Sequence, residues 1–212
     1  MSVPTGSAPL FERLLLASGN RHKYTEFLQL LPREAVKELV FAPDFVVPGR
    51  LPQAVEETGT TYAMNAFLKA RAWAGTFGLP ALADDSGIEL EALSWGPGVR
   101  SARIVEGDDV ARNRWLLDQM RGRGDRRAQF VAAVALAVPE QWTLICEGSC
   151  AGRLAESGAG KNGFGYDPLF IPDGYDVPMA SLPAALKNEI SHRAKAVSVL
   201  LEILRGTSLS SI

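Results

Sequence analysis

Residues 129–138, QFVAAVALAV, carry the clearest strand pattern in the chain. One set of alternating positions holds Phe130, Ala132, Val134, Leu136 and Val138, and the other holds Val131, Ala133, Ala135 and Ala137. A strand that is apolar on both faces is typical of the middle of a sheet with protein packed on both sides. The segment therefore predicts a central strand.

Shorter apolar runs and helical spacings surround this strand. Further strands are predicted at residues 13–17, 38–42, 81–83, 88–93, 142–148 and 169–171, the fifth of them paired with the central strand. Helices are predicted between Asn20 and Pro32 and at residues 60–77, 108–120 and 191–205. Helices alternate with strands, but neighbouring strands interrupt the alternation. The order indicates an α/β fold with a mixed sheet.

Two helices have apolar faces that the sequence assigns to the core. For residues 60–77 the predicted inward stripe is Met64, Phe67, Leu68, Ala72 and Trp73. For residues 191–205 it is Ala194, Val197, Leu200, Leu201 and Leu204. Both stripes follow the helical repeat, which predicts that these side chains pack against the sheet.

Length and composition limit the protein classes. The 212 residues are 47% hydrophobic and 22% charged, which is typical of a globular chain. We expect one domain at residues 13–212 after a flexible extension at residues 1–12. The net charge of −2 does not favour nucleic acid as a partner.

Membrane and secretory signals are not expected. The longest uncharged apolar run, residues 130–138, is far shorter than the roughly 20 residues of a membrane span. The N-terminus does not resemble a signal peptide. Cys146 and Cys150, on one face of an extended segment, lie too far apart to form a disulfide. These observations together predict a cytoplasmic protein.

The first chemical motif is the turn Ser18, Gly19, Asn20, Arg21, His22 and Lys23, between a predicted strand and a helix. Free backbone N–H groups at the positive end of a helix bind phosphate, and a first-turn lysine adds charge. A plain Asn cap with a surface lysine fits the same residues.

Carboxylates form the second and third motifs. Asp84 and Asp85 follow a short apolar strand, where a divalent cation would offset their repulsion and where either could serve as a base. An Asp-Ser-Gly turn is the structural alternative. Glu56 and Glu57 precede the helix that carries Asn65 and Lys69, and they could complete a metal site or only complement the helix dipole.

Aromatic and basic groups form the last two motifs. In the segment from Gly160 to Pro168, glycines around Phe164 free the backbone to approach a flat ligand, and Asp167 offers an acceptor for ring N–H groups. Lys187 and the Ser191-His192-Arg193 run lie near the start of the last helix, where Arg193 could donate to carbonyl oxygens. A structural hairpin and surface charges are the alternatives.

Taken together, these segments resemble the inosine/xanthosine triphosphate pyrophosphatase family. The resemblance rests on LLLASGNRHKYTEF, EETGTTYAMNAFLKARA, ALADDSGIELEAL, PGVRSARI, GFGYDPLF and KNEISHRAKA, which appear in family order over residues 14 to about 205. It implies an elongated α/β protein with a cleft between two lobes, a homodimer. The implied activity is Mg²⁺-dependent hydrolysis of non-standard purine nucleoside triphosphates such as ITP, dITP, XTP and dXTP to the monophosphate and pyrophosphate.

The resemblance also implies roles for individual residues. Asp85 matches the catalytic acid and magnesium ligand, and one of Glu56 and Glu57, with Glu57 favoured, matches a second metal-linked acid. The turn from Ser18 to Lys23 and Lys69 match phosphate-binding groups. The substrate contact and base pocket correspond to Ser86, Phe164, Gly165, Tyr166, Asp167, Lys187, His192 and Arg193.

The sequence departs from the family pattern in three places, and it also bears on two alternative functions. Arg100 stands where many relatives have an aromatic residue, Ala194 follows Ser-His-Arg where Gly is frequent, and residues 1–12 are an extension. A Maf-type pyrophosphatase is disfavoured because SGNRHK does not fit its phosphate turn. A regulator that has lost catalysis is disfavoured by the intact Asp84-Asp85 pair and Lys23.

Base selectivity is the last expectation. Arg193 would donate to the purine C6 oxygen and Asp167 would accept from N1–H, groups that adenine lacks. ATP is therefore predicted to be a poor substrate.

Overall fold

The computed structural model describes residues 8–45 and 55–206. Its strands are β1 (Phe11–Leu16), β2 (Val36–Phe41), β3 (Ala81–Leu90), β4 (Gly96–Pro97), β5 (Arg127–Ala137), β6 (Thr143–Leu154) and β7 (Phe170–Pro172). Its α-helices are α1 (Arg21–Leu30), α2 (Tyr62–Phe77), α3 (Asp109–Gln119), α4 (Ala184–Ile190) and α5 (His192–Gly206). Within these residues, no helix is long and apolar enough to cross a membrane.

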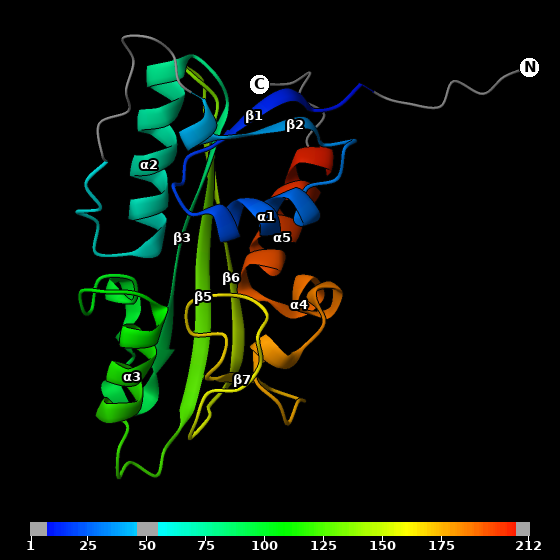
Figure 1. The fold of residues 1–212 in the computed structure, drawn as a ribbon. Coiled ribbons are helices and arrows are strands. Elements are labelled where there is room, and N and C mark those ends of the chain that lie inside the picture. The colour runs from blue at the N-terminus through cyan, green and yellow to red at the C-terminus, as the bar shows by residue number, and fades with distance from the viewer. Residues whose placement is uncertain (1–7, 46–54, 207–212) are drawn as a thin grey trace, which may run out of the picture.

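The strands form one mixed sheet in the order β2-β1-β3-β5-β6-β7, with β4 paired to β3. β1 runs parallel to β2 and β3, whereas β3, β5, β6 and β7 pair antiparallel. The α/β class with a mixed sheet is therefore confirmed. In Figure 1 the molecule is elongated, and the long strands β5 and β6 run along it from the α2 end to the α3 end. The division into two lobes stays a prediction.

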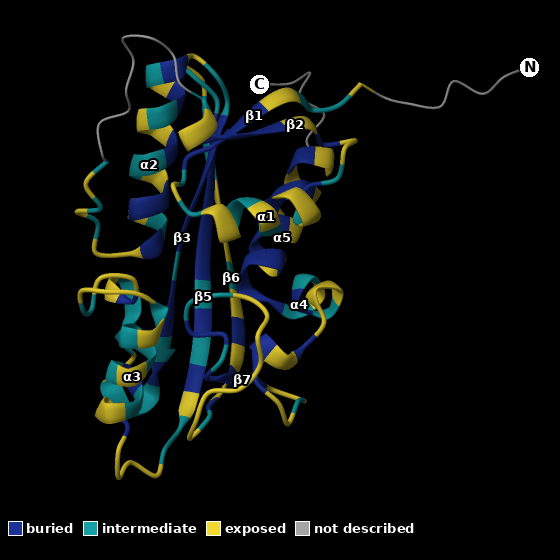
Figure 2. Cartoon of the chain, in the orientation of Figure 1, coloured by how far each residue is buried: buried dark blue, intermediate teal, exposed yellow. Residues whose placement is uncertain are grey.

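Two helical layers cover the sheet at one end. α2 packs on one face, over Leu15, Ala83 and Ala133, and α1 and α5 pack on the other, over Leu16, Leu82 and Val134. A third cluster, around Ile88 and Leu116, fills the opposite end. Figure 2 shows β5 largely buried between these layers, whereas exposed residues alternate with buried ones along much of β6. The central position predicted for residues 129–138 is confirmed, because β5 pairs with β3 and β6 and its residues from Ala132 to Ala137 are buried.

The inward stripe predicted for α2 is wrong. Met64 is 50% exposed and Phe67 is 38% exposed, and the buried face instead carries Ala66, Ala70 and Ala74 with Tyr62, Asn65 and Phe77. The sheet below is lined by alanines of β3 and β5. The small side chains on the helix and on the sheet let the helix lie close to the sheet, and Met64 and Phe67 point outward.

The turn alternative at Asp84–Gly87 is also wrong. β3 continues through these residues and pairs with β5 along its length, with Asp84 opposite Val134 and Asp85 opposite Ala133. These residues stay in a strand because cationic side chains contact the two carboxylates, one on each face of the sheet, as described below. Gly87 is needed here, since a Cβ at this position would lie 2.4 Å from the Gly98 carbonyl oxygen.

Smaller differences concern the ends of elements. β1 begins at Phe11, two residues before the predicted strand, and residues 1–7 of the predicted extension lie outside the described part. β6 extends to Leu154, and α4 was not predicted. Cys146 and Cys150 are unpaired and buried on β6, as expected.

The inward face predicted for the last helix is confirmed, because all five of its residues are buried. The first turn of α5 lies directly on β6 at Gly148. A Cβ on Gly148 would lie 2.3 Å from the His192 carbonyl oxygen and 2.5 Å from the Ala196 nitrogen, both backbone atoms. This contact therefore sets where His192 and Arg193 enter the molecule.

Gly148→Ala is expected to lower the free energy of unfolding by about 1–3 kcal/mol, because the added methyl group forces α5 away from β6. Gly75→Ala on α2 is the matched control, since a Cβ there meets nothing within 4 Å. The control should stabilise the helix by up to about 1 kcal/mol. Chemical denaturation measures both, and an unchanged stability of Gly148→Ala would contradict the close contact.

Candidate active site

The turn after β1 caps α1 and faces a cavity. Asn20 is the N-cap, and its side-chain oxygen accepts hydrogen bonds from the backbone N–H groups of His22 at 2.9 Å and Lys23 at 3.2 Å. The Asn20 N–H itself donates to Ser18 Oγ at 3.2 Å. Asn20 and Lys23 also line the central cavity described below. The capping role and a ligand-binding role are therefore compatible.

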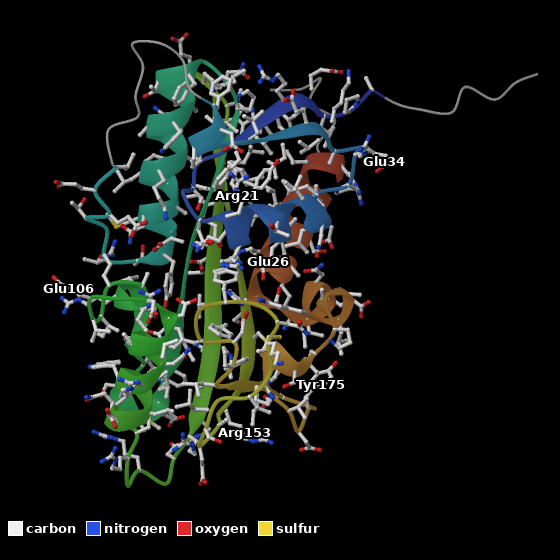
Figure 3. The ribbon with its side chains drawn as sticks, in the orientation of Figure 1. Arg21, Glu26, Glu34, Glu106, Arg153 and Tyr175 are labelled. Atoms are coloured by element: carbon white, nitrogen blue, oxygen red, sulfur yellow. The ribbon has the colours of Figure 1, made fainter. Side chains whose placement is uncertain are left out.

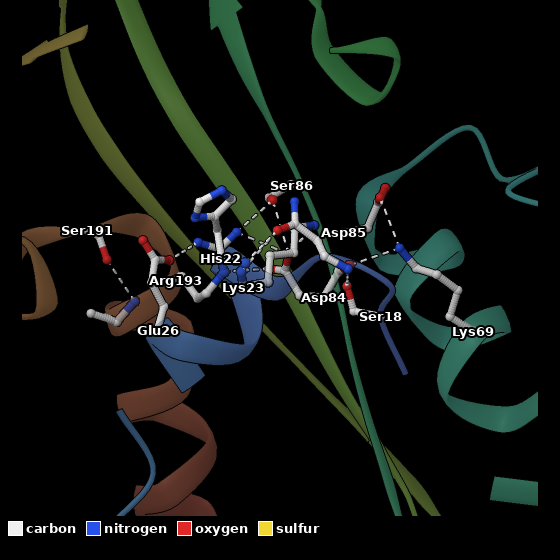
Figure 4. A network of polar contacts seen from close by, with 12 residues as sticks. Ser18, His22, Lys23, Glu26, Lys69, Asp84, Asp85, Ser86, Ser191 and Arg193 are labelled. Atoms are coloured by element: carbon white, nitrogen blue, oxygen red, sulfur yellow. Dashed lines mark hydrogen bonds and ion pairs between the residues drawn. The ribbon is translucent and has the colours of Figure 1, made fainter. Parts of the chain in front are cut away.

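Asp84 is the anionic centre on the α1 and α5 side of the sheet. Lys23 Nζ lies 2.6 Å from Asp84 Oδ2, and Arg193 donates from Nε at 3.2 Å and from NH2 at 3.1 Å to its two oxygens. Figure 4 shows these groups around Ser86, whose hydroxyl donates to Asp84 Oδ2 at 3.1 Å. Burial opposes ionisation, but Arg193 and Lys23 outweigh it and hold the pKa of Asp84 far below its usual range.

Arg193 connects this centre to α1. Its NH1 donates to Glu26 Oε2 and its NH2 donates to Ser86 Oγ at 3.0 Å. With the two bonds to Asp84, four of the five guanidinium donors have protein partners. One N–H is left without a protein partner among the described residues, so Arg193 chiefly holds Asp84 and Glu26 in place.

Asp85 points to the other face, towards α2. Its Oδ2 accepts from Asn65 Nδ2 at 3.1 Å, and its Oδ1 lies 3.3 Å from Lys69 Nζ. Burial raises the pKa of Asp85, and Lys69 only partly opposes this. The two adjacent aspartates therefore differ: Asp84 is fixed as an anion between two cations, and Asp85 is the more basic carboxylate.

Lys69 joins Asp85 to Glu57. Its Nζ lies 2.6 Å from Glu57 Oε1 and donates to the Asp84 carbonyl oxygen at 2.8 Å. Arg103 binds the other oxygen of Glu57. Burial would raise the pKa of Glu57, but Lys69 and Arg103 hold it below its usual range. Glu56 is exposed and does not face this group, so the geometry favours Glu57 of the two acids.

The carboxylates fit a magnesium ion in part. Asp85 and Glu57 offer hard oxygen donors, and Mg²⁺ is commonly held by one or two carboxylates together with substrate phosphates. In the described residues no group of three or more acidic, His or Cys side chains is arranged to hold a metal. Lys69 bridges the two carboxylates, so metal binding here requires Lys69 to move to another anion, such as a phosphate.

Aromatic and charged groups meet beyond Arg193. Lys187 Nζ pairs with Asp167 and with Glu26, and the Phe164 N–H donates to Asp167 Oδ2 at 2.9 Å. Burial raises the pKa of Asp167, and Lys187 opposes this. The ring of Phe164 stacks on that of His22, with centroids 5.3 Å apart. Lys187 Nζ and the Arg193 guanidinium lie 5.0 and 5.7 Å from the centroid of the same ring.

His192 is neutral in this setting. Burial, reinforced by Arg193, lowers its pKa well below the usual value. Its ring stacks on Phe130 with centroids 4.8 Å apart, and Nδ1 has no partner among the described residues. His192 therefore lines the central cavity with a neutral ring whose Nδ1 is buried.

A cavity of about 120 Å³, called here the central cavity, joins these groups. Its lining comprises Asn20, Lys23, Ser86, Gly87, Ser101, Ala102, Asp109, Arg112, Phe130, Phe164, Gly165, Tyr166, Asp167, Lys187, His192 and Arg193. Most predicted substrate residues therefore come together. Lys69, Asp85 and Glu57 are not part of this lining, because they lie on the other face of β3 from Asp84.

Two predicted residues point elsewhere. The Arg21 guanidinium pairs with Asp44 at 3.0 and 3.1 Å and lies over the ring of Phe41. Figure 3 shows Arg21 towards β2 and Glu26 on the opposite side of α1. Only the backbone of Arg21 can serve the turn. His22 lines a second cavity, of about 170 Å³, behind Phe164.

Sequence reasoning missed Glu26, Arg103, Asp109 and Arg112 as members of the site. Glu26 follows Lys23 by three residues, and helical spacing places both on one face of α1. That signal was present in the sequence. Arg103, Asp109 and Arg112 have no such local signal, because long-range packing brings their segment to the cavity.

Asp84→Asn is expected to lower the free energy of unfolding at pH 7 by about 3–5 kcal/mol, because Lys23 and Arg193 lose a buried counter-charge. The pKa of Asp84 is lower in the folded chain than in the unfolded chain. The stability that its charge contributes is therefore complete above the usual Asp pKa of about 4 and is lost progressively as the pH falls below that value. Denaturation across pH 3–7 should show the gap to wild type narrowing at low pH. A gap that is constant with pH would contradict the ionised cluster.

Comparisons with known proteins identify the family and the fold of this chain. A family model described as the Ham1 family matches residues 14–203. A protein of Leifsonia xyli subsp. xyli named dITP/XTP pyrophosphatase is 44% identical over 200 residues, which cover 92% of this chain and 97% of that protein. A dITP/XTP pyrophosphatase of Deinococcus deserti is 51% identical over 146 residues, covering 68% and 70% of the two chains.

Solved structures are similar over almost the same range. The structure of a HAM1 protein from Coxiella burnetii matches with a TM-score of 0.80 and 37% identity, covering 92% of this chain and 99% of that one. The crystal structure of a nucleoside-triphosphatase, dITP/XTP pyrophosphatase, from Mycobacterium abscessus matches with a TM-score of 0.70 and 40% identity, covering 89% and 98%. With sequence motifs, fold and family model in agreement, this chain belongs to the Ham1 family.

Proposed function

We propose that this protein hydrolyses non-standard purine nucleoside triphosphates, such as dITP, ITP and XTP, to the nucleoside monophosphate and pyrophosphate. The observation that carries the proposal is the central cavity, whose lining combines Asn20 and Lys23 of the cationic turn with the aromatic and acidic group of Phe164, Tyr166 and Asp167. Asp84 and Asp85 directly precede Ser86 of this lining on β3. The turn suits phosphates and the aromatic group suits a purine. The names of the relatives support the same activity.

The two aspartates have different roles in the proposed reaction. A water molecule beside Asp85 gives a proton to the carboxylate as its oxygen bonds to the α-phosphorus. The bond from that phosphorus to the bridging oxygen breaks, and pyrophosphate leaves. Asp85 is suited to this role because burial raises its pKa, whereas Asp84 is tied to Lys23 and Arg193. Asp84 therefore serves the scaffold of the site.

We expect two lysine side chains to contact the phosphates. Lys23 lines the central cavity, and Lys69 lies between Asp85 and Glu57, where it would turn to the leaving pyrophosphate. Asp85 and Glu57 are the residues that would hold Mg²⁺. When bound there, the ion would neutralise charge on the phosphate oxygens. The magnesium requirement and the homodimer remain proposals that rest on the family resemblance, and the cytoplasmic location remains one that rests on the two unpaired cysteines.

Base selectivity follows from hydrogen-bond donors and acceptors. Phe164 stacks on any purine and so gives affinity without selection. The remaining N–H of Arg193 suits the C6 oxygen of inosine or xanthosine and opposes the amino group of adenosine. Lys187 and Asp167 offer a fixed donor and acceptor beside it.

The activity is tested by pyrophosphate release from ITP and ATP, each with and without Mg²⁺. We expect release from ITP only with Mg²⁺, and kcat/KM for ITP above that for ATP by up to ~10⁴, because a site built on hydrogen bonds rejects analogues that cannot form them. Equal values for the two nucleotides would overturn the proposed substrate class. Release of orthophosphate in place of pyrophosphate would overturn the proposed reaction.

Asp85→Asn is expected to lower kcat by at least ~10²-fold, because the amide neither accepts the proton nor holds the metal. Asp125→Asn, an exposed carboxylate that pairs with Arg127, is the control for the same chemical change. Circular dichroism should show both variants folded. Near-normal turnover of Asp85→Asn would assign the base to another residue.

A further inference from the structure

The peptide of Gly165 is held from across the central cavity by the first turns of α3. Asp109 Oδ2 accepts a hydrogen bond from the Gly165 N–H at 2.6 Å, and Asn113 Nδ2 donates to the Gly165 carbonyl oxygen at 2.9 Å. The two side chains are four residues apart and so lie on one face of the helix. Together they bind both polar groups of a residue next to Phe164.

The same loop is held on its other side by the short turn at Met179–Ser181. The N–H groups of Lys161 and Asn162 donate to the Ala180 carbonyl oxygen at 3.1 and 2.9 Å. The Ala180 N–H donates to the Asp167 carbonyl oxygen at 3.1 Å. Phe164 and Gly165 thus lie between two attachments, one to each side of the cavity.

The α3 attachment is itself rigid. Asp108 caps the helix by accepting from the Ala111 N–H at 3.0 Å, and Leu116 is fully buried in the core at that end. Arg112 holds the second oxygen of Asp109. Gly165 has a φ of 63°, which suits glycine, so the loop conformation depends on this residue and on its two partners.

We propose that Asp109 and Asn113 are positioning residues for the purine base, which hold the Gly165 peptide so that the Phe164 ring stands ready to stack on it. The proposal rests on the proposed function, because it assumes that the pocket beside Phe164 takes a purine. Asp109 and Asn113 act through the loop. They set affinity for the base half of the substrate and leave the phosphate half unaffected.

Matched substitutions separate this role from general packing. Asp109→Asn keeps an oxygen that can accept from the Gly165 N–H but loses the ion pair with Arg112, so a smaller loss of binding is expected than at residue 113. Asn113→Asp has the same shape but lacks the donor, and its carboxylate faces the Gly165 carbonyl oxygen. Asn113→Ala removes the donor without adding charge. The exchange between acid and amide should therefore weaken binding less at residue 109, where the acceptor for Gly165 is kept, than at residue 113, where the donor is lost.

Isothermal titration with two products measures the effect. IMP carries the base and pyrophosphate carries only phosphate. Asn113→Ala and Asn113→Asp should weaken IMP binding on the order of 10-fold, the effect of one lost hydrogen bond, with pyrophosphate affinity unchanged. In kinetics, KM for ITP should rise while kcat stays near wild type. Asp118→Asn is the control, because Asp118 lies on the same helix as Asn113 and its carboxylate pairs with Arg121. This variant should bind both products normally.

Two results would overturn the inference. Wild-type affinity for IMP in both Asn113 variants would show that the attachment does not position the base. Equal losses for IMP and pyrophosphate would show a general structural role. Failure of the wild-type protein to bind IMP and to release pyrophosphate from ITP would overturn the proposed function, and the inference with it.

Discussion

Two carboxylates at adjacent positions of a buried strand are the constraint on which the site depends. Asp84 and Asp85 point to opposite faces of β3, so each needs its own neutralising groups. α1 and α5 supply Lys23 and Arg193 to the first, and α2 supplies Asn65 and Lys69 to the second. The helices on both sides of the sheet therefore contact the same pair of residues. The charges around each aspartate also underlie the different roles proposed for the two.

The long central strands separate the groups proposed to bind the two ends of the substrate. β5 and β6 extend from the layer of α1, α2 and α5 to the loop at residues 155–168, and the central cavity brings Lys23 of α1 together with Phe164 of that loop. Glycines permit the close contacts this needs. Gly148 admits α5 to β6 and Gly87 admits the segment at Gly98–Ser101 to β3. A rigid sheet thus sets the distance between the groups proposed to bind the phosphates and those proposed to bind the base.

Much of this arrangement could be predicted from the sequence, where the signal was local. Alternation identified the central strand, and helical spacing identified the inner face of α5. The motifs identified most residues of the central cavity. Failures occurred where tertiary packing reversed a local preference. The apolar stripe of α2 pointed outward because alanines line the sheet, and Asp84–Gly87 stayed in a strand because distant cations stabilise it. The roles of Arg103 and Asp109 depend on contacts between segments far apart in sequence, which have no periodic signal.

Hydrolysis of ITP in ¹⁸O-labelled water tests the central claim, that water beside Asp85 attacks the α-phosphorus. Because the new bond forms at that atom, the account predicts one labelled oxygen in IMP and none in pyrophosphate, as read by mass spectrometry of both products. Label in pyrophosphate, or formation of IDP and labelled orthophosphate, would place the attack at another phosphorus and contradict the account.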